Sequence, residues 1–134
     1  VIVAHAATTG KSLGEDNMQR LLPMFAQYPR LYTDISSLTQ ANKLRFLPRL
    51  LAAKLDSSRI LFGTDFPLIT TGISSPLFSL FRLPVKTILR LLKIENPWDQ
   101  DLQLKRSFGV PAAVFANANN LLVEKNKVQS EIAE

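Results

Sequence analysis

Three polar side chains able to bind a metal or transfer a proton each follow a short apolar run. They are His5, Asp34 and Asp65. Imidazole and carboxylate groups can ligate a divalent ion, and a carboxylate can also accept a proton from water bound to that ion. His5 could instead polarise a substrate. The structural alternatives stay open at this point: Asp65 would cap the following turn and His5 would form a hydrogen bond in the core.

The spacing of these residues predicts the elements that position them. The three are separated by 29 and then 31 residues. Buried strands that recur about every 30 residues, with helical patterns between them, indicate βα units. We therefore predict adjacent parallel strands, in this order, over residues 1–5, 31–34 and 59–63. Parallel strands of a barrel end on one rim, so the polar side chains should share that rim.

Two amphipathic segments lie between the predicted strands. The first has an apolar stripe at helical spacing and ends before Pro29. The second starts at Thr39 as an N-cap. Their buried faces consist of Met18, Leu21, Leu22 and Phe25 in the first and Leu44, Leu47, Leu50, Leu51 and Leu55 in the second. Pro23 and Pro48 fall inside these patterns and should kink or split both helices.

The segment that begins at Asp34 is typical of a strand end followed by a turn. Residues 34–37 read Asp-Ile-Ser-Ser, and both residue types bond readily to nearby backbone. We therefore interpret Asp34 as a residue that shapes the rim rather than as a catalytic group.

Composition excludes several classes of protein. The 134 residues fit one domain, and 46% apolar and 20% charged residues are typical of a globular chain. Cysteine is absent, which excludes disulfides and cysteine metal sites and fits a cytoplasmic location. The net charge of +5 favours an anionic partner. However, the basic residues form no dense stripe, which argues against nucleic-acid binding.

Residues 8–12, Thr-Thr-Gly-Lys-Ser, resemble the end of a phosphate-binding loop. That motif needs a glycine five positions before Gly10, where this sequence has His5. The first glycine of the motif makes a tight turn that histidine tolerates poorly. We therefore reject a nucleotide site here.

A family resemblance is carried by four runs of sequence. Residues 1–6 (Val-Ile-Val-Ala-His-Ala), 32–36 (Tyr-Thr-Asp-Ile-Ser) and 59–67 (Arg-Ile-Leu-Phe-Gly-Thr-Asp-Phe-Pro) resemble the sixth, seventh and eighth strands of the amidohydrolase-related TIM-barrel hydrolases. The Gly-Thr-Asp-Phe-Pro run is the most specific of these. Residues 109–122 are similar to the closing helix of that family. The resemblance covers most of residues 1–67 and 105–123.

The resemblance implies roles for two residues. Asp65 corresponds to the aspartate of the eighth strand, a metal ligand and proton acceptor. His5 corresponds to the histidine of the sixth strand, a second ligand or a substrate-polarising group. The first-strand His-x-His pair and the fifth-strand ligand are absent, and His5 is the only histidine. We therefore expect the N-terminal half of the barrel to be a missing partner, and the chain to be inactive alone.

The predicted organisation is α/β, the C-terminal portion of a TIM (β/α)8 barrel whose parallel strands alternate with helices. It forms a single partial domain. Residues 1–67 supply the last three strands and two helices, 68–104 a helical insertion, 105–123 the closing helix, and 124–134 a frayed tail.

Residues 73–94 of the insertion have three interpretations. Arg82, Lys86, Arg90 and Lys93 lie at helical spacing among many leucines and phenylalanines. The segment could pack on the barrel, cover the substrate as a lid with Phe78 or Phe81 toward Asp65, or contact an anionic membrane or a partner subunit. We favour packing with a partial lid role, and expect no membrane contact.

The sequence thus predicts part of a metal-dependent hydrolase. Metal-activated water would attack an ester, lactone or amide carbon of a small molecule, or a related decarboxylation would occur. Zinc is the expected ion, with Asp65 and His5 as catalytic residues and ligands. The alternative is a catalytically inactive truncated barrel that acts as a scaffold or interaction piece. A homo-oligomer stays open.

Overall fold

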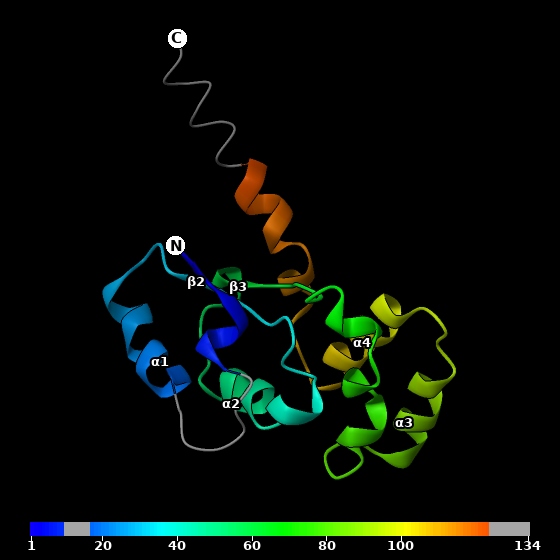
Figure 1. The fold of residues 1–134 in the computed structure, drawn as a ribbon. Helices are drawn as coiled ribbons and strands as arrows, with labels where there is room; N and C mark the ends of the chain where they lie inside the picture. The colour runs from blue at the N-terminus through cyan, green and yellow to red at the C-terminus, as the bar shows by residue number, and fades with distance from the viewer. Residues whose placement is uncertain (10–16, 124–134) are drawn as a thin grey trace.

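A computed structural model describes residues 1–9 and 17–123 (Figure 1). The Gly-Lys-Ser run at 10–12 and the tail at 124–134, which the sequence predicts to be frayed, lie outside these residues. Within the described residues, no helix combines the length and the apolar character needed to cross a membrane.

The described strands form one parallel sheet. They are β1 (Ile2–Val3), β2 (Tyr32–Asp34) and β3 (Ile60–Leu61), in the order β1-β2-β3. The register pairs Ile2 with Tyr32, Val3 with Thr33, Thr33 with Ile60, and Asp34 with Leu61. The predicted order and direction are therefore confirmed, although each strand is shorter than its predicted range.

Helix α1 (Asn17–Gln27) connects the first two strands. The 3-10 turn η1 (Ala4–Ala7) precedes it in the chain. Met18, Leu21 and Phe25 are buried, which confirms the predicted apolar stripe. Pro23 lies inside α1 without dividing it, so the helix is not split there.

The second crossover differs from the predicted single helix. It consists of η2 (Ala41–Lys43), α2 (Phe46–Ala52) and η3 (Ser57–Arg59). Pro48 is the third residue of α2, where a backbone N–H has no intrahelical partner in any case. The prediction of Thr39 as an N-cap is wrong, because its hydroxyl donates a hydrogen bond to Asp101 Oδ1 at 2.6 Å.

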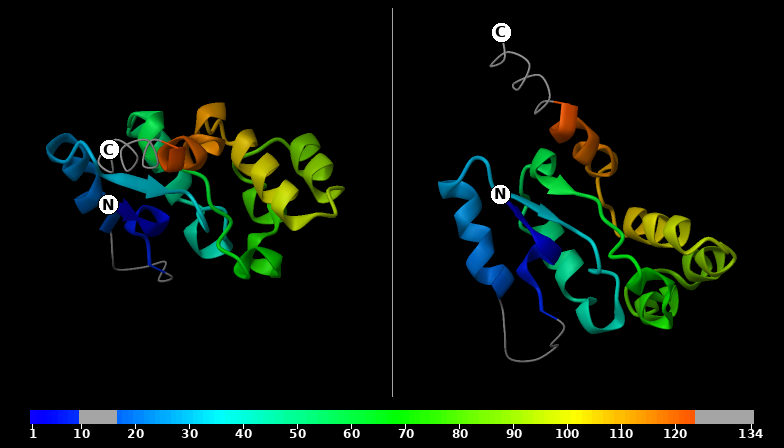
Figure 2. Two further views of the ribbon diagram at one scale, coloured as in Figure 1. Left: turned by 90° about the horizontal axis from the view of Figure 1, so that it is seen from above. Right: turned by 45° about the horizontal axis from the view of Figure 1, so that its top comes forward.

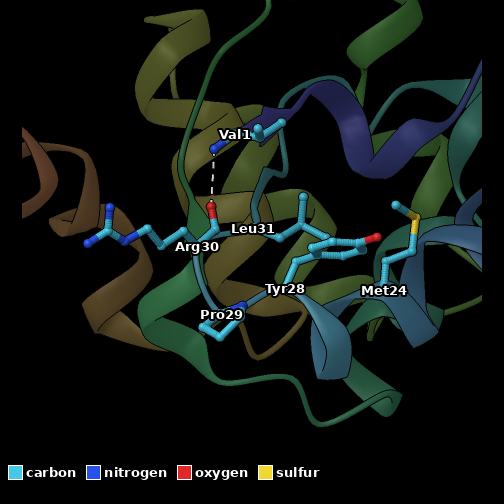
Figure 3. Close-up of a pocket in the computed structure, with 6 residues that line it drawn as sticks. All are labelled: Val1, Met24, Tyr28, Pro29, Arg30 and Leu31. Atoms are coloured by element: carbon cyan, nitrogen blue, oxygen red, sulfur yellow. Dashed lines mark hydrogen bonds between the residues drawn. The ribbon is translucent and has the colours of Figure 1, made fainter.

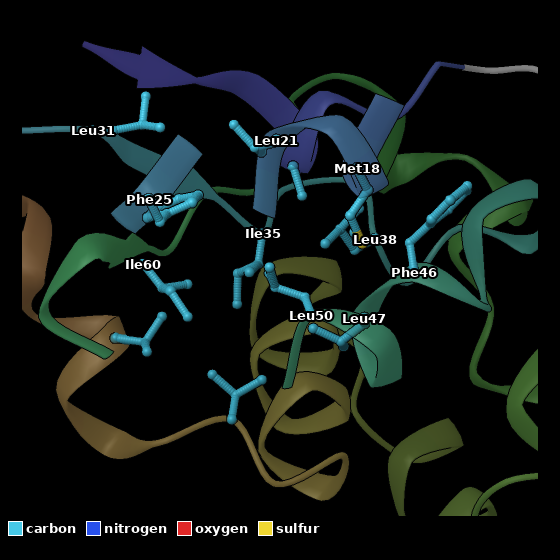
Figure 4. Packing of buried hydrophobic residues seen from close by; sticks show 13 residues of the cluster. Met18, Leu21, Phe25, Leu31, Ile35, Leu38, Phe46, Leu47, Leu50 and Ile60 are labelled. Carbon is cyan, nitrogen blue, oxygen red and sulfur yellow. The ribbon is translucent and has the colours of Figure 1, made fainter. Parts of the chain in front are cut away.

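Figure 4 shows the core, which forms where α1, α2 and the sheet meet. Its members come from every part of the chain up to residue 60 and from the segment after α4: Ala6, Met18, Leu21, Phe25, Leu31, Ile35, Leu38, Phe46, Leu47, Leu50, Ile60, Val110 and Val114. The leucines of the second amphipathic pattern that enter this buried set are Leu47 and Leu50.

The chain after β3 is helical. Three 3-10 turns come first, followed by two α-helices, a further 3-10 turn and a helix over residues 117–123. The bounds are η4 (Leu68–Thr70), η5 (Gly72–Ser74), η6 (Pro76–Ser79), α3 (Val85–Leu92), α4 (Pro97–Ser107) and η7 (Ala112–Phe115). Helices α3 and α4 lie at the opposite end of the molecule from α1 (Figures 1 and 2). Helix α4 also runs across residue 104, the expected end of the insertion.

Candidate active site

The three polar residues singled out from the sequence meet at the carboxyl ends of the strands. His5 follows β1, Asp34 ends β2, and Asp65 follows β3. The His5 side chain is 30% exposed, and the Asp34 and Asp65 side chains are 19% and 20% exposed. All three are thus shielded but reachable by water, as expected on the rim of a parallel sheet.

The backbone at His5 has an uncommon conformation. His5, Ala6 and Ala7 have φ angles of 53°, 51° and 59°, a left-handed turn of three residues with side chains. Such a conformation costs roughly 1–3 kcal/mol per residue and persists only where surrounding contacts hold it. Two contacts do so: the Thr8 N–H donates to the His5 carbonyl at 2.9 Å, and the His5 N–H donates to Asp34 Oδ1 at 3.1 Å.

Asp34 organises the rim through one carboxylate oxygen. Its Oδ1 accepts hydrogen bonds from the backbone N–H of His5, from the backbone N–H of Ser36 at 2.9 Å, and from the Ser36 hydroxyl. The predicted bond from Asp34 back to its own turn is therefore confirmed. Asp34 positions other groups at this rim, as its interpretation as a shaping residue requires.

The Ser36 hydroxyl determines which nitrogen of His5 is free. His5 Nδ1 lies 2.7 Å from Ser36 Oγ, and the single hydroxyl hydrogen is directed to Asp34. Ser36 Oγ must therefore accept from His5 Nδ1–H. In the neutral ring this leaves a lone pair on Nε2, which lies 3.7 Å from Asp65 Oδ1. The prediction that His5 and Asp65 are close on one rim is confirmed.

Asp65 is held from a second side by a residue that sequence reasoning missed. Gln40 Nε2 donates to Asp65 Oδ2 at 3.1 Å, which leaves Oδ1 directed toward His5. Asp65 also has a positive φ of 58°. Two residues earlier, a Cβ at Gly63 would lie 3.0 Å from Ser36 Cβ, so the close approach of the two loops favours glycine there.

A buried lysine lies beside these carboxylates. Lys43 Nζ donates to Ser37 Oγ at 2.7 Å. Burial lowers the pKa of Lys43, and the nearby charges of Asp65 and Asp34 partly oppose that shift. The burial of Lys43 was not predictable from the sequence, because one lysine in an amphipathic segment usually faces solvent.

A second buried lysine joins α4 to the loop before Asp65. Lys105 Nζ donates to Asp101 Oδ2 at 2.5 Å and to the Gly63 carbonyl at 3.0 Å, and its side chain is fully buried. Burial lowers the pKa of Lys105, with Asp101 acting in the opposite direction. Asp101 also accepts from Thr39. An acid and a lysine four residues apart are usually a surface pair, so the pattern did not reveal a buried one.

The donor atoms fit part of a metal site. Two ligand atoms on a tetrahedral zinc ion lie about 3.3 Å apart, given bonds of about 2.0–2.1 Å. The 3.7 Å between His5 Nε2 and Asp65 Oδ1 is close to that separation. Among the described residues, however, no group of three or more potential ligands gathers around one point. His5 and Asp65 alone would therefore be only part of a set of ligands.

A hollow of about 710 Å³ lies elsewhere, beside the start of β1 (Figure 3). Met24, Tyr28 and Leu31 line it, and the Val1 ammonium donates to the Arg30 carbonyl at 3.1 Å. It lies at the amino ends of the strands, whereas the polar residues lie at the carboxyl ends. We therefore assign no part of the candidate site to this hollow.

Comparison with known protein families assigns this chain to one of them. The model of a family described as amidohydrolase matches residues 1–107. The chain belongs to the amidohydrolase family. No curated protein and no solved structure gives a significant match.

Membership of the amidohydrolase family implies the TIM-barrel fold and hydrolase-type chemistry. A three-stranded parallel sheet with intervening helices is consistent with part of such a barrel. The match also includes residues 68–104, which the sequence motifs did not connect to the family. Helices α3 and α4 thus lie entirely within the matched region.

Proposed function

We propose that this chain is the C-terminal part of a metal-dependent hydrolase, in which β1, β2 and β3 are the last three strands of the barrel. Water would attack an ester, lactone or amide carbon of a small molecule, or the same site would carry out a related decarboxylation. The observation that carries the proposal is the free Nε2 of His5 directed at the Asp65 carboxylate on the carboxyl rim.

His5 and Asp65 have complementary parts in this proposal. His5 Nε2 and Asp65 Oδ1 would hold a divalent ion, with zinc expected because it binds imidazole and carboxylate ligands. A bound divalent ion lowers the pKa of its water and polarises a carbonyl. Asp65 would then accept the proton released by that water. Residues outside the described ones would supply the other ligands.

The neighbouring residues would act as positioning groups. Ser36 accepts the Nδ1 hydrogen of His5 and so fixes the tautomer that presents a lone pair on Nε2. Asp34 orients Ser36, and Gln40 restrains Asp65 through its other oxygen. This arrangement of indirect contacts is typical of metal-binding histidines and carboxylates.

The test uses the fact that the chain has one histidine. Zinc is titrated into the 134-residue chain, and the ¹⁵N resonances of the His5 ring are followed by NMR. We expect the zinc-free spectrum to show hydrogen on Nδ1 and zinc to shift Nε2. Asp65→Asn should weaken zinc binding about 10–100-fold, the range typical of lost support at a metal site. The matched control, Asp99→Asn on an exposed part of α4, should bind like the wild type. Equal zinc affinity for Asp65→Asn and the wild type would contradict the proposal.

The partial set of ligands favours an alternative, in which this chain is a non-catalytic barrel segment or scaffold. Among the described residues no third ligand joins His5 and Asp65. Hydrolysis of an aryl ester by a protein in which this chain is joined to the rest of the barrel, measured with and without added zinc, separates the two cases. Zinc-dependent turnover that Asp65→Asn abolishes would exclude the scaffold alternative.

A further inference from the structure

Charge is distributed unevenly in the chain after Asp65. Residues 66–94 contain four basic residues, Arg82, Lys86, Arg90 and Lys93, and no acidic residue. All four are exposed. They account for most of the net charge of +5 and are confined to the end of the molecule that carries α3 (Figure 1). The stretch 66–94 is therefore cationic, and exposed acids occur again only after it, at Glu95 and Asp99.

Helix α3 is apolar on two faces. Ile88 and Leu91 are buried against the neighbouring elements, as expected for a helix that packs on the domain. Val85 and Leu89 are 61% and 57% exposed, and Leu92 is also exposed. A surface helix normally has polar residues on its outer side. The outer apolar stripe of α3 is thus not explained by packing within the described chain.

The apolar and basic stripes of α3 run side by side. Val85, Leu89 and Leu92 have the spacing i, i+4, i+7, and Lys86, Arg90 and Lys93 repeat it one residue later. Val85 and Leu89 of the first stripe and all three residues of the second line one shallow hollow of about 640 Å³. Just before α3, Phe81 has an exposed fraction of 101%, so its ring contacts essentially nothing in the chain. We call Phe81, the three apolar residues and the four basic residues the basic-apolar face.

We propose that the basic-apolar face binds the surface of an anionic lipid membrane. Lysine and arginine are attracted to acidic headgroups, while exposed leucine and phenylalanine enter the boundary between headgroups and acyl chains. The absence of any acid over residues 66–94 complements a uniformly negative surface. The proposal stands independently of the proposed hydrolase function.

The observations favour a lipid surface over an acidic protein. A protein partner needs a complementary shape and paired polar groups at the contact. Here the most exposed side chain, Phe81, projects from the surface rather than lining the hollow. Leu77, Phe78 and Leu80 nearby are also partly exposed, which extends the apolar surface without forming one pocket. A fluid lipid boundary accommodates such a projection without a preformed partner.

The lid interpretation receives no support from the aromatic residues that should have carried it. Phe81 is fully exposed and covers nothing, and Phe78 is exposed as well. The aromatic partner of Phe66, which directly follows Asp65, is Trp98 at a centroid distance of 6.2 Å. The sequence predicts no membrane contact, whereas the exposed apolar side chains of the basic-apolar face favour our proposal of one.

Co-sedimentation of the 134-residue chain with lipid vesicles tests the proposal. The vesicles contain phosphatidylcholine alone or phosphatidylcholine with phosphatidylserine, each at low and high salt. We expect binding only to the phosphatidylserine vesicles, and weaker binding at high salt because salt screens the headgroup charge. Absence of binding to anionic vesicles at low salt, or equal binding to both vesicle types, overturns the proposal.

Two pairs of variants locate the contact. Lys86→Gln with Arg90→Gln should lower partitioning about 30-fold, since each basic residue at the surface contributes about a factor of five. The control, Arg20→Gln with Arg30→Gln, removes the same charge from exposed positions near α1 and should change partitioning by less than this. Phe81→Ser should lower partitioning about tenfold, whereas Tyr28→Ser, at another exposed aromatic residue, should not.

The same variants distinguish surface binding from unfolding. Every replaced side chain of the basic-apolar face is exposed, so the thermal unfolding midpoint should stay at its wild-type value. Equal loss of vesicle binding in the α3 pair and the α1 pair would show a general charge effect and contradict a defined face. Binding of an acidic peptide through these residues, without binding to anionic vesicles, would indicate a protein partner and contradict the proposal.

Discussion

A single hydroxyl hydrogen decides the chemistry available to His5. Ser36 Oγ donates to Asp34, so it accepts from Nδ1 and leaves Nε2 with its lone pair. Had Ser36 donated to His5, Nε2 would carry the hydrogen and could not bind a cation. At the residue scale, the candidate site therefore depends on Asp34, which fixes the orientation of Ser36.

The burial of the Lys43 ammonium predicts how the free energy of unfolding depends on pH. Its pKa in the folded chain lies below the ordinary value of 10.5, because burial disfavours the charge. Between the lowered pKa and 10.5, the unfolded chain binds this proton more fully than the folded chain does. The free energy of unfolding should therefore rise with pH in that interval. Lys43→Met cannot titrate and should flatten the rise, as measured by urea unfolding at several pH values.

A control isolates Lys43 from the other groups that titrate at high pH. Lys54→Met removes an exposed ammonium and should keep the wild-type dependence on pH. If Lys43→Met and the wild type gain the same stability as pH rises toward 10.5, the buried ammonium does not carry the effect.

At the scale of elements, a position just beyond the end of α2 has a backbone conformation that favours glycine. Lys54 follows the helix with a φ of 51°, and its N–H donates to the Leu51 carbonyl at 3.2 Å. A left-handed residue just beyond a helix is usually glycine, because a side chain costs free energy there. Lys54→Gly should therefore raise the free energy of unfolding by about 1 kcal/mol. Lys93→Gly, after α3 with a φ of −81°, is the matched control and should bring no gain. A gain of similar size in both would argue against the conformational cause.

The buried pair on α4 gives a second prediction at this scale. Lys105→Met leaves the Asp101 carboxylate buried without its cation, which should cost about 3–5 kcal/mol of unfolding free energy. Removing both charges, in Lys105→Met with Asp101→Leu, should recover much of that loss because no unpaired charge remains. Exposed Lys86→Met is the control in the same urea titrations. A double variant as unstable as Lys105→Met alone would show that lost packing, rather than charge, is the cause.

An element can be predicted from the sequence where the residues that determine it are close to one another in the sequence. The strands and α1 were predicted from apolar runs and their spacing. Apolar residues in such a pattern are buried in the core whatever the path of the connecting segment. The start of the second helix was not, because Thr39 bonds to Asp101, 62 residues away. Lys105 binds the same Asp101, and its burial was likewise not predictable from its neighbours in the sequence. At the candidate site, positions at strand ends predicted that His5 and Asp65 would meet, but not that Gln40 and Ser36 would orient them.

At the scale of the whole molecule, the sheet brings together what the sequence separates. Three strands in order place His5, Asp34 and Asp65 on one rim, and the chain belongs to the amidohydrolase family. The segment after Asp65 continues from the rim to the basic-apolar face at the α3 end (Figure 2). The candidate site and the proposed membrane surface are thus joined by one short stretch of chain.

The last prediction concerns the proposed hydrolase, in which this chain would complete a metal site. Asp65→Asn should lower kcat about 10²–10⁴-fold, because the amide can neither accept the proton of the attacking water nor ligate as strongly. Stability should change little, since Asn keeps the shape of the side chain and can still accept from Gln40. A chelator should abolish wild-type turnover and added zinc should restore it, whereas zinc should not rescue the variant. Asp99→Asn, exposed on α4, serves as the control in the same kinetic and thermal measurements. A variant at Asp65 with wild-type kcat would remove this carboxylate from the mechanism, whatever its distance from His5.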